Sequence, residues 1–238
     1  VKNNTAGEGS AFINRATLNV TNSTIGLNTS TNTGSAAIHS FGASSVTNLV
    51  NVTIAENIGG GVLSPDHVTL KSTIIYDNSV YDCDHQEEIG YFEDLGGNVM
   101  AESCGARWND VVDPQLGSFT GEYFPIAVGS PAIDLAPDCA GLTEDQAGNP
   151  RPQGSACDSG AYEADISSVT CAGLPVTGGV LPSGTYTLGA DCALTAPLVI
   201  QTGATVTING DGYALIGYAR HRVMQIDAGG TLFLNDAV

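Results

Sequence analysis

A repeat of irregular length dominates the first eighty residues. It occurs as TLNVTNSTIGLN at 17–28, VTNLVNVTIAEN at 46–57 and HVTLKSTIIYDN at 67–78. Each copy alternates apolar and polar residues, which predicts a β-strand with one face inward. Each copy closes on Ile, two variable residues and Asn. We expect this Asn at a turn, because Asn tolerates the left-handed backbone conformation and bonds its own main chain.

The spacing of the closing asparagines selects the fold. Asn28, Asn57 and Asn78 recur after 29 and then 21 residues, which suits a coil of three short strands joined by loops of variable length. A propeller blade needs about twice that length. Stacked coils of this kind form a parallel β-helix, in which each coil buries its apolar side chains against its neighbours. Asparagines at equivalent corners can then stack into a side-chain ladder.

The two ends of the chain, written one after the other, reproduce the repeat. TLFLNDAV at 231–238 followed by VKNN at 1–4 aligns with residues 17–28. The aligned pairs are Thr231 with Thr17, Leu232 with Leu18, Leu234 with Val20, Asp236 with Asn22, Val238 with Thr24, Val1 with Ile25, and Asn4 with Asn28. We therefore expect the ends to continue into those of a neighbouring copy; the alternative is a fragment with arbitrary boundaries. The residues of this join are Val1, Lys2, Asn3, Asn4, Leu232, Leu234 and Val238.

Four later motifs resemble a known family. They are DPQLG at 113–117, GSPAID at 129–134, DQAGNPRPQG at 145–154 and CDSGAYE at 157–163. In this order they look like the C-terminal part of bacterial choice-of-anchor surface proteins, and the coil segments NSTI and NVTI also resemble that family. The resemblance covers roughly residues 1–165 and implies a right-handed parallel β-helix of the pectate-lyase-like superfold ahead of this module. In the family an anchoring tail usually follows, whereas here residues 166–238 look like the start of another β-helix.

These observations give one architecture. We expect an all-β chain: a right-handed parallel β-helix, or β-solenoid, with a loop-rich, disulfide-bonded C-terminal module. Its parts are β-helix coils at 1–112, the family-like module at 113–164, a junction at 165–170 and the start of the next β-helix at 171–238. The natural order is then 166–238 followed by 1–165, so the chain is circularly offset.

Six cysteines indicate a disulfide framework. They fall into the neighbouring pairs Cys83 and Cys104, Cys139 and Cys157, and Cys171 and Cys192. Six cysteines allow fifteen pairings, so neighbour pairing is a hypothesis, and six buried free thiols are the alternative. Each neighbour pair would close a loop of roughly twenty residues and stabilise the fold by about 3 kcal/mol. Disulfides place a protein outside the cytoplasm; since the sequence shows no signal peptide, we expect a processed or excised piece.

The excess of acidic residues limits the kinds of partner that this chain can bind. Asp and Glu outnumber Lys and Arg by 25 to 7, for a net charge of −18. Nucleic acid and anionic lipid would both be repelled, and the apolar runs are too short to span a bilayer. We therefore expect no nucleic-acid partner, no membrane insertion and no cofactor except calcium. The acidic stretch YDCDHQEE at 81–88 is a solvated loop, a calcium site formed by Asp82, Asp84 and Glu87, or a catalytic pair of carboxylates, of which the solvated loop is the simplest interpretation.

Three function classes compete. The first is a structural subunit of an extracellular bacterial filament on the cell surface, not an enzyme, whose partners are copies of itself. The second is an adhesin that binds surface glycans through Thr-rich faces or the basic cluster Arg220, His221 and Arg222. The third is a polysaccharide lyase or hydrolase, which needs converging carboxylates or a basic residue beside acids. The sequence offers no acids at matching coil positions, and we expect Asp134 and Asp145 in the module to accept backbone N–H groups at turns.

Overall fold

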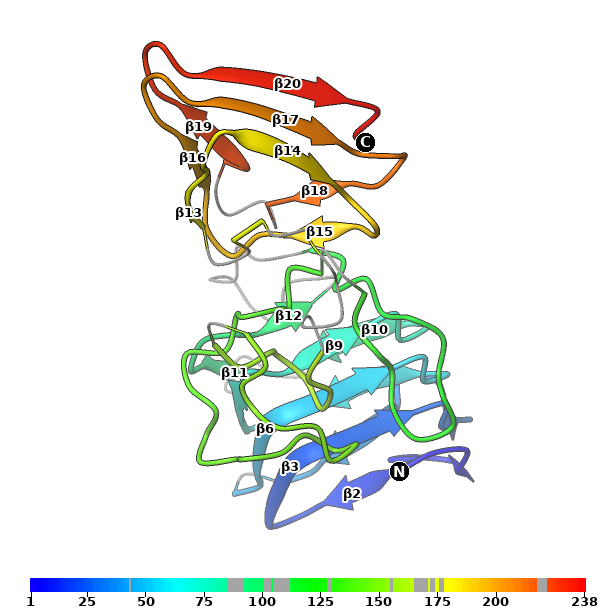
Figure 1. Cartoon of the computed structure of the whole chain (residues 1–238). Helices are drawn as coiled ribbons and strands as arrows, with labels where there is room; N and C mark the ends of the chain where they lie inside the picture. Colours follow the sequence, from blue (N-terminus) through cyan, green and yellow to red (C-terminus); the bar gives the residue numbers. More distant parts are fainter. Residues whose placement is uncertain are drawn as a thin grey trace. The chain divides into compact units, whose positions relative to one another are not determined.

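The computed structural model describes residues 1–42, 44–84, 92–100, 104, 112–127, 130–154, 156–164, 171, 174–175, 178–217 and 222–238 (Figure 1). The chain divides into two compact units. Unit 1 comprises Val1–Pro152 and Ala156–Ala164, and unit 2 comprises Gln153–Ser155 and Asp165–Val238. The regular elements of both are β-strands, and all the strand pairs are parallel.

Unit 1 is a β-solenoid. One sheet has the order β10-β7-β5-β2, a second contains β3, β6, β8, β9, β11 and β12, and β1 pairs with β4. The strands are β1 (Thr5–Ala6), β2 (Phe12–Asn14), β3 (Thr17–Gly26), β4 (Thr29–Ser30), β5 (Ala36–Ser40), β6 (Val46–Ala55), β7 (Gly60–Leu63), β8 (His67–Lys71), β9 (Ile74–Tyr76), β10 (Tyr81–Asp84), β11 (Phe92–Asp94) and β12 (Val99–Met100).

The register of the second sheet confirms the repeat predicted from the sequence. Thr17 lies opposite Val46, and Val46 lies opposite His67, as the aligned stretches require. Inward positions therefore stack in columns, one of which contains Val20, Leu49 and Leu70. Because each coil buries these side chains only against the coils beside it, the core runs along the axis of the solenoid.

Unit 2 is built in the same way. Its three sheets have the orders β13-β16-β19, β14-β17-β20 and β15-β18. The strands are β13 (Gly179–Val180), β14 (Gly184–Thr187), β15 (Cys192–Ala193), β16 (Leu198–Ile200), β17 (Thr205–Asn209), β18 (Leu215–Ile216), β19 (Met224–Ile226) and β20 (Thr231–Asn235). Its core includes Leu198, Ile200, Val206 and Ile208, all fully buried.

The described residues of 113–164, apart from Gln153 and Gly154, belong to unit 1 and pack against its coils. They form turns and two isolated antiparallel bridges, Leu116 with Ile126 and Glu144 with Pro150. The fully buried Phe124 lies so close to Gly26 that a Cβ there would sit 2.7 Å from the ring. The expected junction at 165–170 lies outside the described residues.

Three disulfides join the cysteines in the neighbouring pairs that the sequence favours. The Cα–Cα distances are 5.3 Å for Cys83–Cys104, 5.4 Å for Cys139–Cys157 and 5.3 Å for Cys171–Cys192. The loops span 21, 18 and 21 residues. Such a framework is typical of an oxidising compartment outside the cytoplasm.

Candidate functional site

The first coil of unit 1 has a partly open edge. On one side β3 pairs with β6 along its whole length. On the other edge, within the described residues, its backbone pairs only with the first two residues of the chain. The Val1 amino group donates to the Thr24 carbonyl at 2.7 Å, the Gly26 N–H donates to the Val1 carbonyl at 3.1 Å, and Lys2 forms a parallel bridge with Gly26. Val1 therefore lies opposite Ile25, and the edge from Thr17 to Ser23 stays open.

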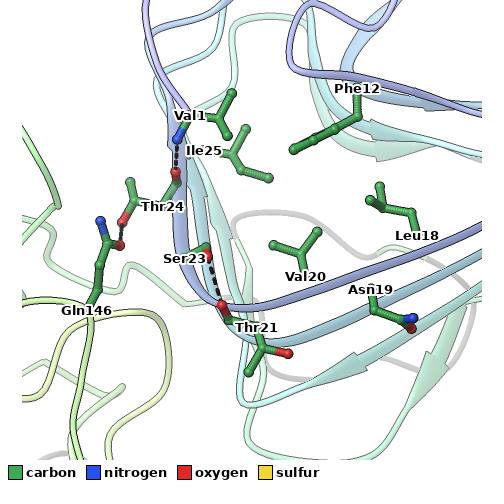
Figure 2. Close-up of a pocket in the computed structure, with 10 residues that line it drawn as sticks. All are labelled: Val1, Phe12, Leu18, Asn19, Val20, Thr21, Ser23, Thr24, Ile25 and Gln146. Atoms are coloured by element: carbon green, nitrogen blue, oxygen red, sulfur yellow. Dashed lines mark hydrogen bonds between the residues drawn. The ribbon is translucent and has the colours of Figure 1, made fainter.

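A hollow of about 420 Å³ lies at this open edge (Figure 2). Its apolar wall is formed by Phe12, Leu18, Val20 and Ile25. A polar pair stands at its rim, where the Thr24 hydroxyl donates to Gln146 Oε1 at 2.7 Å. Val20 and Ile25 are buried, whereas Phe12 and Leu18 are only partly buried, so the hollow leaves some apolar surface that another coil could cover.

A ladder of asparagines follows the corner of the same coils, as predicted. Each side-chain Nδ2 donates to an Oδ1 of the next residue in the ladder, and each backbone N–H donates to the same Oδ1. The Nδ2–Oδ1 distances along Asn4, Asn28, Asn57, Asn78 and Asp82 are 2.9, 3.0, 2.8 and 2.9 Å. Asn4, which the sequence alignment places at this corner, therefore takes its expected position.

The turn chemistry at this corner agrees with the prediction in part. The Asn side chains bond their own main chain, since each donates to the carbonyl two residues earlier, as Asn28 does to Gly26 at 3.1 Å. The left-handed residues, however, are Leu27, Glu56 and Asp77, each immediately before the Asn rather than the Asn itself.

The left-handed residues mark the coils at two fixed places. Kink residues within the long strand path are Asn22 (φ 50°), Asn51 (φ 51°) and Ser72 (φ 50°), and corner residues are Leu27 (φ 59°), Glu56 (φ 54°) and Asp77 (φ 57°). Each corner residue follows its kink residue by five positions (22 to 27, 51 to 56, 72 to 77). Asn3 (φ 56°) is a corner residue, and Asp236 (φ 48°), just after β20, is a kink residue.

The last coil of unit 2 also has an open edge. Among the described residues β20 is the last strand of its sheet, paired with β17. Leu232 lies opposite Val206 and Leu234 opposite Ile208, so both occupy inward columns. Val206 and Ile208 are fully buried, whereas Leu234 is 51% exposed because no further coil covers it. Beyond β20, the Val238 N–H donates to the Tyr213 carbonyl at 3.2 Å, so the chain continues along the coil before it.

The residues expected at the join thus lie on two open edges, one in each unit. Lys2 has contacts that sequence reasoning missed: its Nζ donates to the Gly121 carbonyl, and it stands 5.5 Å from the centroid of the Phe119 ring. Both partners belong to the module and carry no periodic signal, so only the folded chain brings them to Lys2.

The calcium hypothesis stays a prediction. Asp82 is buried and ends the asparagine ladder, where its Oδ1 accepts both N–H groups of Asn78. Asp84 is exposed at the end of β10, and Glu87 lies outside the described residues. Within the described residues, no three His, Cys, Asp or Glu side chains gather as a metal site would require.

A buried network of charges holds the module together. Arg151 Nη1 donates to Glu163 Oε2 at 2.8 Å, and both side chains are fully buried. Asp145 accepts the backbone N–H groups of Ala147, Asn149 and Glu163, and the first two lie in its own turn, which confirms the role predicted for it. Asp134 accepts the backbone N–H of Ala156, 22 residues away, so this bond does not belong to a local turn.

Asp158 is a group in this network whose acidity is changed by burial. Its two carboxylate oxygens accept the N–H groups of Asp134 and Ala164 at 2.8 and 2.7 Å. Burial, and then the negative charge of Glu163, raise the pKa of Asp158 to about 8. These side chains lie under backbone rather than in a cleft, so we assign the network a structural role.

The basic cluster proposed for glycan binding is only partly described. Arg222 is exposed, and Arg220 and His221 lie outside the described residues. Comparisons with known protein families, with curated proteins and with solved structures find no match to this chain. Among its described residues no helix is long and apolar enough to cross a bilayer.

Proposed function

We propose that the chain is a structural unit of an extracellular filament, in which copies join end to end as one continuous β-solenoid. Residues 231–238 of one copy lie along the open edge of β3 in the next. The disulfides suit an oxidising compartment, and the net charge of −18 keeps such units soluble. A place on the bacterial cell surface follows from the resemblance to anchored surface proteins.

The observation that supports this proposal most directly is the spacing between the left-handed kink and corner residues. Within unit 1 the corner residue follows the kink residue by five positions in three successive coils. Counted from Asp236 through Val238 and on from Val1, the corner residue Asn3 also comes fifth. The count across the join therefore equals the count within unit 1, although Asp211 (φ 50°), one coil before Asp236, has no left-handed residue five positions later.

The side chains on the two edges complement each other. With Lys2 opposite Gly26, counting back through the join places Leu234 opposite Val20 and Leu232 opposite Leu18. Both pairs then extend inward columns already occupied by Ile208 and Val206. The join would fill the hollow and pair two strand edges that otherwise invite unspecific association.

A charge placed at the join tests the proposal. We expect Leu234→Asp to weaken association at least about 100-fold, because the join would bury the carboxylate without a partner. Phe233→Asp is the matched control, since Phe233 lies on the same strand, faces outward and is 55% exposed. Sedimentation velocity over a range of concentrations gives both affinities. The end-to-end join would be contradicted if the wild-type chain stays monomeric at all concentrations. It would also be contradicted if both variants lose the same amount of affinity.

Intact mass of native material under reducing, denaturing conditions distinguishes two forms of the filament. The mass of one chain means separate subunits that complete one another's coils. A much larger mass, with a tryptic peptide that spans Val238 and Val1, means a tandem-repeat polyprotein. Both forms contain the same join, and the measurement decides only whether a peptide bond closes it.

One surface favours a second function, glycan binding by an adhesin. The outward row across β14, β17 and β20 contains Thr185, Thr207 and Phe233, beside a second row of Thr187, Asn209 and Asn235. An exposed aromatic ring flanked by amides and hydroxyls suits a sugar ring, whose apolar face stacks while its hydroxyls form hydrogen bonds. Phe233→Ala should abolish binding on a glycan array without changing assembly; an array with no bound glycan for the wild-type chain would contradict this function.

A further inference from the structure

We propose that the joint between copies is reciprocal. While residues 231–238 of one copy lie on β3 of the next, Val1 and Lys2 of that next copy lie on the open edge of β18 in the first. There the Lys2 N–H donates to the Leu215 carbonyl. This inference rests on the proposed end-to-end assembly and adds a second strand exchange to it.

The backbone of Lys2 faces away from its own unit. Val1 uses both of its main-chain groups toward β3: the amino group donates to Thr24 and the carbonyl accepts from Gly26. In a parallel sheet a residue directs its N–H and C=O to one edge, and the next residue directs both to the other edge. The N–H and C=O of Lys2 therefore point toward the open side of the coil.

The backbone of Leu215 offers the complementary edge. Ala214 and Ile216 accept the N–H groups of Cys192 and Leu194 at 2.7 and 2.8 Å. Their main-chain groups thus face β15, and by the same alternation those of Leu215 face the other edge. Among the described residues β18 is the last strand of its sheet.

The register of the last residues aligns these two backbones. The Val238 N–H donates to the Tyr213 carbonyl at 3.2 Å, which places Val238 opposite Ala214. The residue after Val238 in the continued solenoid lies opposite Leu215, and in the joined copy that residue is Val1. The following N–H, that of Lys2, then meets the Leu215 carbonyl, as the slanted bonds of a parallel pair require.

The side chains of Leu215 and Val1 also favour this contact. Leu215 lies opposite the buried Cys192 and packs against the core of unit 2, yet it is only partly buried. Val1 is 50% exposed and lies beside Ile25 of the unit 1 core. A joint that places Val1 over Leu215 would cover both and connect the two apolar columns.

The first test compares two variants of Lys2. Lys2→Ala removes the side-chain contacts with Gly121 and Phe119 and keeps the N–H. Lys2→Pro removes the same contacts and also the N–H, which makes no bond within its own unit in this arrangement. We expect Lys2→Pro to associate about tenfold more weakly than Lys2→Ala in sedimentation velocity, because the Leu215 carbonyl loses its donor. Equal affinities of the two variants would overturn the reciprocal joint.

A cross-link tests the same contact without proline. Chains with Lys2→Cys are mixed with chains with Ile216→Cys, since the register places residue 2 opposite residue 216. We expect a reducible dimer, whereas Lys2→Cys mixed with Thr187→Cys, two coils from the open edge, should give none. If the two mixtures cross-link equally slowly while the wild-type chain still associates, the reciprocal joint is wrong and the end-to-end assembly stands. If the wild-type chain does not associate, both the reciprocal joint and the end-to-end assembly are wrong.

Discussion

Two rows of stacked asparagines, one in each unit, differ in their surroundings. In unit 1 the row runs inside a corner, where Asn28 and Asn57 are fully buried. In unit 2 a row lies on the outer face: Asn235 Nδ2 donates to Asn209 Oδ1 at 2.9 Å, and Asn209 Nδ2 approaches Thr187 Oγ1 at 3.5 Å. The spacing of the coils is the same in both rows, but water reaches only the outer one.

The difference shows that the contribution of a repeated Asn to stability depends on whether its amide is buried. Inside the corner, each amide satisfies backbone groups that are buried away from water, and a buried polar group without a partner costs about 1–3 kcal/mol. On the outer face, water replaces any bond that the amide loses. We therefore expect the inner row to determine the stability of unit 1 and the outer row to contribute little to that of unit 2.

The largest expected effect is at the centre of the inner row. Asn57→Ala removes the acceptor of the Asn28 N–H groups and the donor to the Ile25 carbonyl at 3.1 Å. With several buried groups left unpaired, the free energy of unfolding should fall by about 3–5 kcal/mol. Urea unfolding measures it. Asn57→Asp should cost at least as much, because a carboxylate would face carbonyl oxygens; a loss below about 1 kcal/mol for either variant would contradict the buried role.

The position of this row was predictable from the sequence, but its chemistry was only partly so. The spacing of Asn28, Asn57 and Asn78 predicts stacked corners, because one residue type recurs at the end of each alternating strand. The same pattern does not reveal that the preceding residue takes the left-handed conformation. Leu27 and Glu56 are poor candidates by residue type, yet both adopt it immediately before the Asn of the ladder.

Two other features carry no signal in the sequence. Asp82 ends the inner row, yet it lies in an acidic stretch that favours a solvated loop or a calcium site. The buried Arg151–Glu163 pair joins residues of a loop-rich segment with no period, so neither alternation nor spacing predicts it. Both depend on how the chain returns on itself after residue 78, which local patterns do not determine.

The disulfides give a second way to compare the units. Unit 2 has no described module over its coils, and Cys171–Cys192 ties the first described residue after Ala164 to its core. Replacing both cysteines by Ala should lower the free energy of unfolding by about 3 kcal/mol. Limited proteolysis should then cleave unit 2 before unit 1. If the protease cleaves unit 1 first, unit 2 is not the less stable of the two units.

Acidity provides a third probe, confined to unit 1. Because the pKa of Asp158 is raised to about 8, folded Asp158 keeps a proton that the unfolded chain loses near pH 4. The folded state binds more protons between these values, so the free energy of unfolding should fall from pH 5 to pH 8, by at most about 1.4 kcal/mol per pH unit. Asp158→Asn should flatten this slope in urea unfolding, whatever its effect on absolute stability. An unchanged slope would assign the pH dependence to another group.

The smallest expected effect completes the comparison between the two rows. Asn235→Ala removes the 2.9 Å bond to Asn209 at an exposed position, where water hydrates the remaining Oδ1. The free energy of unfolding should change by no more than about 0.5 kcal/mol, as is usual for surface substitutions. The outward direction of Asn235 also keeps it out of the proposed join, so association should persist. A loss above about 1 kcal/mol would mean that stacking, rather than burial, gives these asparagine rows their energy.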